Sequence, residues 1–402
     1  MPAASGETPG PLVFQSHLEY CFKMKFTFVV VVVVAVAVLA SAPRLEARPS
    51  ISLDCRLALT APNRQLNLAG CIFDGMNLRG MNFRGAGLVK ASFIQTDLTG
   101  ANFDNATATM AVFKNATLTG ATFRKAVLTG ANFDRSNLVG SIFEAARLSR
   151  TSFQDAELQN SNFNNATATA AVFSGAKLYG ASFRSASLGG AFFGGSNLKN
   201  AKFDSANLNS ADLTAVIADG ASFVSATLTS VDLSYASAVG AVFTNALLNR
   251  SELVGSDFSS ATFTGADLRR STLDLSILSK AKMSNAKLKH ASLALVVATS
   301  VNFEGADLSY AHLLNANFSG ATLTNANLDY SVASFAIMDN VDLRGCSIKF
   351  STWHEVRMAT ADVRGAHFGH TSLLGSDLSI AATSGATFEE TVLPDGTISS
   401  VR

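Results

Sequence analysis

The sequence of 402 residues has few charged side chains and no excess of either sign. Charged residues make up 15% of the chain, against about 25% in an average soluble protein. Lys plus Arg (31) nearly equals Asp plus Glu (30), so the chain lacks both the basic charge that attracts nucleic acid and an acidic surface that could imitate it. Because 48% of the residues are hydrophobic, an intrinsically disordered chain is also excluded.

The abundant feature is an apolar residue at every fifth position. From Leu68 to Leu393 there are 66 such positions, which we call centres, and 59 of them hold Phe, Leu, Ile, Val, Met or Trp. A small residue usually stands two positions before each centre. A spacing of five fits neither the 3.6-residue period of an α-helix nor the alternation of a flat strand. The pattern therefore predicts a solenoid, in which the backbone coils so that like positions stack.

These units resemble the pentapeptide repeat family, whose motif is Ala, then Asp or Asn, then Leu or Phe, then two variable residues. Clear examples are residues 131–135, 206–210 and 306–310. The resemblance implies an all-β solenoid: a right-handed, quadrilateral β-helix with five residues on each side and twenty in each coil. On this basis we expect residues 66–395 to form about 16 coils, with short caps at both ends.

The sequence also predicts how the interior is filled. All fourteen centres that end in 3 between Phe73 and Phe203 are Phe, whereas the intervening centres are mostly Leu. With four sides in each coil, Phe would line two opposite faces, and each Phe would stack on the Phe twenty residues away. Nearly every inward position is then apolar, so burial stabilises the rod without a ligand or metal.

Residues 1–48 form an N-terminal extension of different character. Its central run, 26–42, carries no charge and is rich in valine, and Lys23 and Lys25 precede it. Starting from Met24, the basic beginning, apolar middle and small-residue end are typical of a secretory signal peptide. Three alternatives remain open: a cleaved signal and a secreted protein, an uncleaved membrane anchor with the repeats outside the cytoplasm, or an apolar stretch without a targeting role.

Both ends of a solenoid need protection, because end coils expose apolar side chains and strand edges. We expect residues 49–65 to form the N-terminal cap. Cys55 lies in this segment and Cys71 in a small inward position of the first coil. In an oxidising compartment they could form a disulfide closing a loop of about 17 residues, worth about 3 kcal/mol; two separate buried thiols are the alternative.

At the other end, the turn residues Pro394, Asp395 and Gly396 stop the coil, which leaves 396–402 as a C-terminal tail. The last centres are less regular than the rest, so this end is expected to hold either a cap or a surface for end-to-end self-association. Cys346 occupies a small-residue position and is expected to be a buried substitute for Ala.

One outward column, read every twenty residues, is cationic or aromatic through seven coils. We call it the ladder: Arg250, Arg270, His290, Tyr310, Tyr330, Phe350 and His370. Further cations lie in neighbouring columns: Arg269, Lys280, Lys282, Lys287 and Lys289. We predict one of two roles for the ladder. It binds an anionic or glycan partner through charge, rings and hydrogen bonds, or its side chains only stack and stiffen the rod.

Catalytic and metal-binding patterns are not recognisable in this chain. Ser and Asp are abundant because the repeat demands them, so a Ser-His-Asp set chosen from the sequence would be arbitrary. His354, His367 and His370 are the only His residues close together, and they lack a metal-ligand spacing. The glycines recur at the corners of the coil and form no phosphate-binding loop. We expect no enzyme activity, no cofactor and no metal.

The sequence thus predicts a secreted or surface-anchored scaffold that binds an unidentified protein or glycan and no nucleic acid. An extracellular polysaccharide-binding rod is the alternative. Some members of the resembled family imitate DNA and bind type II topoisomerase, but those carry a strongly acidic rod. The net charge of +1 here does not favour that function.

Overall fold

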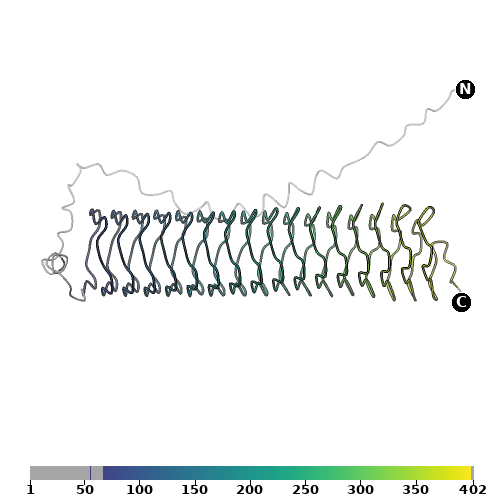
Figure 1. Cartoon of the computed structure of the whole chain (residues 1–402), viewed down its shortest axis with the longest axis horizontal. Coiled ribbons are helices and arrows are strands. Elements are labelled where there is room, and N and C mark those ends of the chain that lie inside the picture. Colours follow the sequence, from purple (N-terminus) through teal and green to yellow (C-terminus); the bar gives the residue numbers. More distant parts are fainter. Residues whose placement is uncertain (1–54, 56–66, 400–402) are drawn as a thin grey trace, which may run out of the picture. The chain divides into compact units, whose positions relative to one another are not determined.

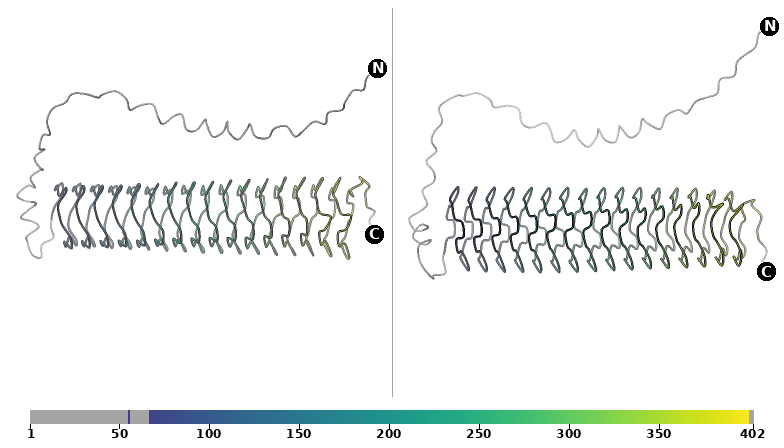
Figure 2. Two further views of the ribbon diagram at one scale, coloured as in Figure 1. Left: turned by 90° about the horizontal axis from the view of Figure 1, so that it is seen from above. Right: turned by 45° about the horizontal axis from the view of Figure 1, so that its top comes forward.

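The computed structural model describes Cys55 and residues 67–399, which belong to one unit, Ile51–Arg402. Successive coils of this unit follow one another along a single axis in chain order (Figure 1), and two further views show the same regular stacking (Figure 2). The extension 1–48, with its apolar run 26–42, and nearly all of the expected cap 49–65 lie outside the described residues. Within the part that is described, no helix is long and apolar enough to cross a membrane.

Each pentapeptide contributes one bridging residue and a two-residue turn, and residues 67–399 contain no helix and no longer strand. The bridges are parallel and join each residue to the one twenty positions later, from Asn67↔Gly87 to Ser372↔Val392. In a typical unit, the N–H of Phe103 donates to the carbonyl of Thr122 over 2.7 Å. Four pentapeptides therefore separate stacked positions, and the chain forms the right-handed β-helix that its repeats predict.

The corners of the coil are tight turns that place one residue in the left-handed region. At a representative corner, the N–H of Ala101 donates to the carbonyl of Leu98 over 2.9 Å, and Gly100 between them has a φ of 67°. This combination is typical of a type II turn, whose third residue needs a positive φ. Gly takes this conformation without steric cost, which explains why small or polar residues are common at the fifth position of the repeat.

The interior of the N-terminal half is a double stack of phenylalanine rings. Rings twenty residues apart lie parallel, as in Phe123 and Phe143 with centroids 4.8 Å apart and planes 4° apart. Rings ten residues apart meet edge to face, as in Phe123 and Phe133 at 5.6 Å and 89°. All these side chains are fully buried. The stacking predicted from the sequence is confirmed, and both arrangements are favourable for aromatic pairs.

The interior of the C-terminal half is more varied. Trp353 is fully buried and follows the small centre Ala333 in the same column. Its indole N–H donates to the hydroxyl of Ser331 over 2.9 Å, so its polar atom is satisfied as burial requires. The large centre Trp353 is therefore accommodated next to a small one.

The final coil closes on one side only. The turn at residues 394–396 reverses the chain, so that Val392 pairs antiparallel with Ile398 and the N–H of Leu393 donates to the carbonyl of Thr397 over 2.7 Å. The first residues of the expected tail thus cover part of the end. The centre Thr383 stays exposed, whereas Leu378 and Phe388 are half-buried, as expected for the last turn of a solenoid.

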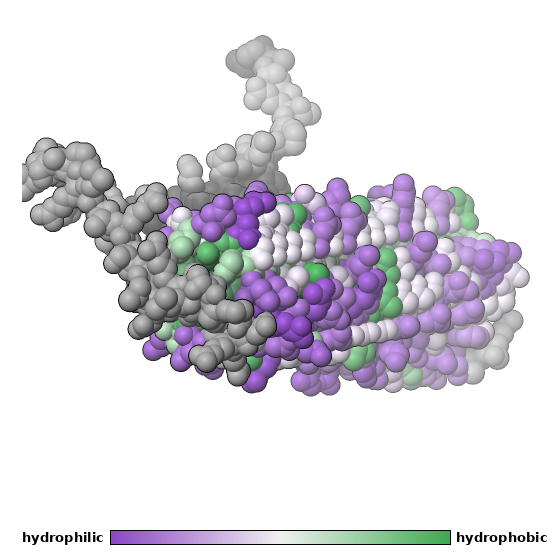
Figure 3. Space-filling view, turned by 60° about the vertical axis from the view of Figure 1, so that its left-hand side comes forward, coloured by the Kyte–Doolittle hydropathy of each residue, from purple (hydrophilic) through white to green (hydrophobic). Residues whose placement is uncertain are grey.

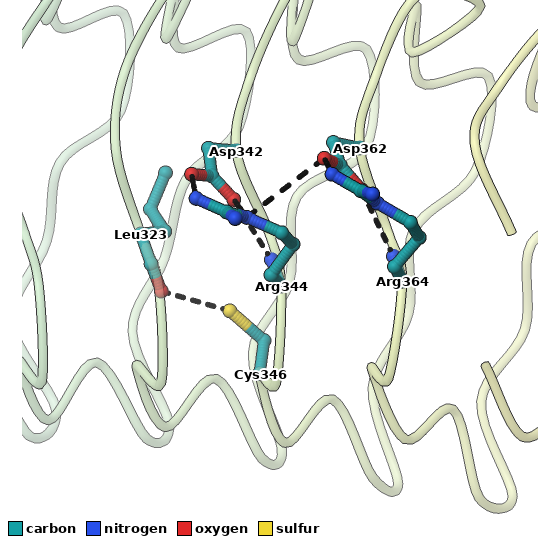
Figure 4. Close-up of polar contacts among 6 residues, drawn as sticks. All are labelled: Leu323, Asp342, Arg344, Cys346, Asp362 and Arg364. Carbon is teal, nitrogen blue, oxygen red and sulfur yellow. Dashed lines mark hydrogen bonds and ion pairs between the residues drawn. The ribbon is translucent and has the colours of Figure 1, made fainter. Parts of the chain in front are cut away.

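The described cysteines occur in two environments, a disulfide and a buried thiol. Cys55 is joined to Cys71 by a disulfide with a Cα–Cα distance of 6.0 Å. Cys346 is buried in the small inward position, where its thiol donates to the carbonyl of Leu323 over 2.9 Å (Figure 4). Burial raises the pKa of the Cys346 thiol to about 12, so this sulfur is protonated and replaces Ala, as predicted.

Candidate partner-binding surface

The coil brings the seven ladder residues into one column on the surface. Each is exposed, and each backbone N–H donates to a carbonyl of the next coil. For example, Tyr310 donates to Asp329 over 2.9 Å and Tyr330 donates to Lys349 over 2.7 Å. The hydrogen-bonded backbone therefore fixes the spacing of the ladder side chains.

The rings of the ladder are stacked on one another. From His290 to His370 the successive centroids are 4.7, 4.6, 5.0 and 4.7 Å apart. The first pair is tilted by 34°, and the others lie within 12° of parallel. Exposed fractions are 37% for Tyr310, 43% for Tyr330 and 48% for Phe350. Because each inner ring is covered on both faces, only ring edges and the two tyrosine hydroxyls are open to a ligand.

Large side chains at these positions are costly for the backbone. All seven ladder residues have a positive φ, between 53° and 61°, a conformation that bulky residues rarely adopt. Earlier in the same column the chain has Gly190, Ser210 and Ser230, and a Cβ added at Gly190 would meet nothing within 4 Å. The fold thus accepts small residues in this column, and the rings are a property of this surface rather than a requirement of the coil.

A pocket of about 500 Å³ lies at the N-terminal end of the ladder. Three successive coils contribute the same two positions to it. We call it the basic pocket, and its lining residues are Asn249, Arg250, Arg269, Arg270, Lys289 and His290. The Nζ of Lys289 lies 5.2 Å from the ring centroid of Tyr310, within cation–π distance. The pocket and the ring stack are therefore continuous.

Only one cation of the basic pocket takes part in an ion pair among the described residues. Arg269 donates from Nε and Nη2 to the carboxylate of Asp267, over 2.8 and 2.5 Å. Burial opposes ionisation of Asp267, but the hydrogen bonds from Arg269 outweigh it and keep the pKa of Asp267 below its usual value. Arg250, Arg270 and Lys289 form no ion pair within residues 67–399, so the pocket carries uncompensated positive charge.

Several arginines elsewhere on the rod are paired with acidic neighbours. Figure 4 shows Arg344 between Asp342 at 2.7 Å and Asp362 at 3.8 Å, and Arg364 against Asp362 at 2.6 Å. On the face visible in Figure 3, hydrophilic side chains are distributed along the rod, and hydrophobic residues form small separate patches. The local excess of cations distinguishes the basic pocket from this arrangement.

His370, at the far end of the ladder, and His354 have ordinary polar partners. Nδ1 of His370 lies 3.0 Å from a carboxylate oxygen of Glu390, which continues the column. His354 is 2.8 Å from the hydroxyl of Ser372. In residues 67–399 and Cys55, no three His, Cys, Asp or Glu side chains are grouped to hold a metal ion.

Sequence reasoning overlooked two parts of this surface. Asn249 lines the basic pocket but was not grouped with the cations. A second exposed corner carries large apolar residues: Tyr235, Leu275, Leu295 and Phe335, with exposed fractions of 71, 57, 51 and 49%. Reading the positions that end in 5 at intervals of twenty would have revealed this corner, because the same column periodicity applies to it.

Comparisons with solved structures identify several similar proteins, some of them described as pentapeptide repeat proteins. HetL from the cyanobacterium Nostoc sp., described as involved in heterocyst differentiation regulation, is 21% identical over 81% of this chain and 93% of its own, with a TM-score of 0.14. QnrB1, a plasmid-mediated fluoroquinolone resistance protein, is 20% identical over 53% of this chain and 94% of its own, with a TM-score of 0.24. A protein from the Arabidopsis thaliana thylakoid lumen is 24% identical over 27% of this chain and 63% of its own, with a TM-score of 0.15. No curated protein matches the sequence.

Family models cover most of the repeat region. The model for a pentapeptide repeat region matches residues 116–193. The model for pentapeptide repeats in eight copies matches residues 64–100, 88–124, 176–214, 206–245, 239–274, 276–313 and 306–345. Together with the bridges at intervals of twenty residues, these matches show that the chain belongs to the pentapeptide repeat family.

Proposed function

We propose that this protein is a non-enzymatic scaffold outside the cytoplasm, secreted or anchored at the cell surface, and that it binds a partner through the ladder and the basic pocket. The observation that carries this proposal is the continuous stack of exposed rings at positions with positive φ. A positive φ is common to the corners of the coil, and the earlier coils show that the fold accepts Gly or Ser in this column, so the coil does not require these rings.

The scaffold is proposed to be a four-sided rod of about 16 coils, since residues 67–399 repeat at intervals of twenty. Such a rod holds surface groups at fixed separations along its length. It can therefore present a row of side chains to an extended partner without rearranging, which reduces the entropic cost of binding.

Two features support a location outside the cytoplasm. The run at residues 26–42 has the composition expected of a signal peptide or a membrane anchor. The disulfide between Cys55 and Cys71 belongs to a class of bond that persists mainly in oxidising compartments. The same disulfide joins Cys55 to the first coil.

The other functions considered from the sequence have less support. Pentapeptide repeat proteins are generally structural or interaction proteins, which favours a scaffold over an enzyme. Imitation of DNA requires a dense acidic surface, whereas this chain has a net charge of +1 and a basic pocket. An extracellular polysaccharide-binding rod is compatible with the scaffold, and the basic pocket favours it.

The location is tested by N-terminal sequencing of the native protein from separated membrane and extracellular fractions. A chain beginning between Ser41 and Arg48 in the extracellular fraction agrees with secretion, and a retained run 26–42 in membranes agrees with a surface anchor. An intact chain confined to the cytosol contradicts the proposal.

The binding surface is tested with a Tyr310→Ser, Tyr330→Ser double variant on a glycan array and in sedimentation with cell-wall material. Ser occurs naturally at positions 210 and 230 of this column, so the coil should tolerate it. We expect the folded double variant to lose binding that the unmodified protein shows. Equal binding by both would exclude the ladder as the partner surface.

A further inference from the structure

The basic pocket gathers like charges at a single place on the rod. Arg250, Arg269, Arg270 and Lys289 line it without a carboxylate among the lining residues. Against these four cations, the ion pairs of the described residues supply one carboxylate, Asp267, which is bound to Arg269. Like charges on adjacent coils repel one another, so in the absence of a ligand this arrangement costs free energy.

The coil does not require this clustering. The two positions that hold these cations are Asn209 and Ser210 two coils earlier and Thr229 and Ser230 one coil earlier. Arg250 and Arg270 stand at corners with φ of 61° and 60°, as do cations elsewhere on the rod, such as Lys90 and Arg150. The feature that distinguishes this place is therefore charge repulsion across three successive coils. An anion bound there offsets this repulsion.

The chemistry of the pocket suits oxygen anions. Guanidinium groups bind carboxylate and sulfate with paired N–H donors. Arg269 uses Nε and Nη2 for Asp267, which leaves Nη1 available and holds the group in a fixed orientation. Asn249 and His290 add polar atoms to the lining of the pocket. The volume of about 500 Å³ is within the usual range for small-ligand sites.

The ring stack next to the basic pocket indicates which kind of anionic polymer can bind there. Single-stranded nucleic acid binds by stacking its bases on free aromatic faces. The inner rings Tyr310, Tyr330 and Phe350 have both faces covered by their neighbours, so they offer no platform for bases. They offer two hydroxyl groups in line with the cations, which suits hydrogen bonds to the hydroxyls of a sugar chain.

We infer that the basic pocket binds the sulfate or carboxylate groups of an acidic polysaccharide, whose chain continues along the edges of the ladder. This inference rests on the proposed function and specifies the partner. Because the net charge of the whole protein is only +1, attraction to the polymer arises locally, in the pocket, and not from the overall field of the protein. Binding should therefore depend on particular cations rather than on total charge.

The test uses dextran sulfate and unsulfated dextran of the same length as probes, with the full-length protein. The pocket variant is Arg250→Ser, Arg270→Ser. The control is Lys90→Ser, Arg150→Ser, which removes two exposed cations from the same column at the same φ, 59° and 58°, but far along the chain. Both variants change the net charge equally, and each replaces a cation with the residue found at positions 210 and 230.

We expect dextran sulfate, and not dextran, to bind the unmodified protein. Loss of two charge-assisted contacts should weaken this binding about tenfold or more in the pocket variant, with less than about a twofold change in the control. A polygalacturonate probe distinguishes carboxylate from sulfate as the preferred group. Thermal unfolding of each variant verifies that the fold is retained.

Four results would overturn the inference. Equal loss in pocket and control variants would mean that only total charge matters. Equal binding of dextran and dextran sulfate would exclude an anion site. Binding of an oligonucleotide or polyglutamate as tight as that of dextran sulfate, and equally lost in the pocket variant, would refute the polysaccharide class. If the pocket variant still binds while the Tyr310→Ser, Tyr330→Ser variant does not, the proposed function stands and this inference fails.

Discussion

The rod carries two aromatic stacks built on the same backbone repeat, one inside its N-terminal half and one outside its C-terminal half. Ring centroids are 4.7–5.0 Å apart from Phe143 to Phe203 and 4.6–5.0 Å apart from His290 to His370. The interior rings are fully buried, whereas Tyr310 to Phe350 are 37–48% exposed. The coil therefore sets the spacing of both stacks, and burial alone decides whether a stack stabilises the fold or forms a surface.

The largest expected effect comes from the interior stack. Replacing Phe133 with Ala removes a fully buried ring and its contacts with Phe113, Phe123, Phe143 and Phe153. A buried Phe→Ala change typically costs about 3–5 kcal/mol. Hydrogen exchange of amides in the flanking coils should show this loss locally, because a solenoid is stabilised mainly by contacts between neighbouring repeats. Unchanged protection around residue 133 would refute the stabilising role of the interior stack.

The second-largest effect on stability is expected from the disulfide, which lies at the end of the rod where the interior stack begins. Replacing Cys55 and Cys71 with Ala removes a constraint worth about 3 kcal/mol. We expect faster hydrogen exchange in the first coils, near Phe73, with no change around the ladder. Cys346→Ala is the matched control, because its thiol only replaces Ala in an inward position. An equal effect of both changes would show that the disulfide has no special role at this end.

A single change in the exposed stack should have a smaller effect. Tyr330→Ser removes contacts with Tyr310 and Phe350 from an exposed position, and the coil accepts Ser in this column, so stability should fall by only about 1 kcal/mol. Thermal unfolding of the Tyr330→Ser and Phe133→Ala variants under the same conditions compares the stability that each change removes. A loss as large as that of Phe133→Ala would mean that the ladder stiffens the rod, which is the alternative that the sequence left open.

The smallest effect is expected from the surface ion pairs. Hydrogen bonds from Arg344 keep the pKa of Asp342 below its usual value, and those from Arg364 do the same for Asp362. A lowered folded-state pKa stabilises the fold above the unfolded value, about 3.9, and this contribution disappears as the pH falls through the folded value. Arg344→Ala should therefore be slightly less stable at neutral pH and equal to the unmodified protein in strong acid. A difference that grows on acidification would contradict this sign.

The sequence predicted the inside of the molecule better than the outside, for a physical reason. Inward positions such as Phe123 and Cys346 must fit a coil of fixed width, so the period of five determines their environment. Outward positions such as Arg250 and Arg269 are free to vary, and the sequence alone could not show that Asp267 neutralises only the second of them. The covered faces of the ladder rings depend on side-chain orientation, which a column of residue names does not specify.

The most direct test of the account is to measure stability and binding together in the Tyr310→Ser, Tyr330→Ser variant. We predict an unfolding midpoint close to that of the unmodified protein, since the coil accepts Ser in this column, together with loss of binding to dextran sulfate. Retained binding with a large loss of stability would contradict the account, because the exposed stack would then serve the fold in the same way as the interior one.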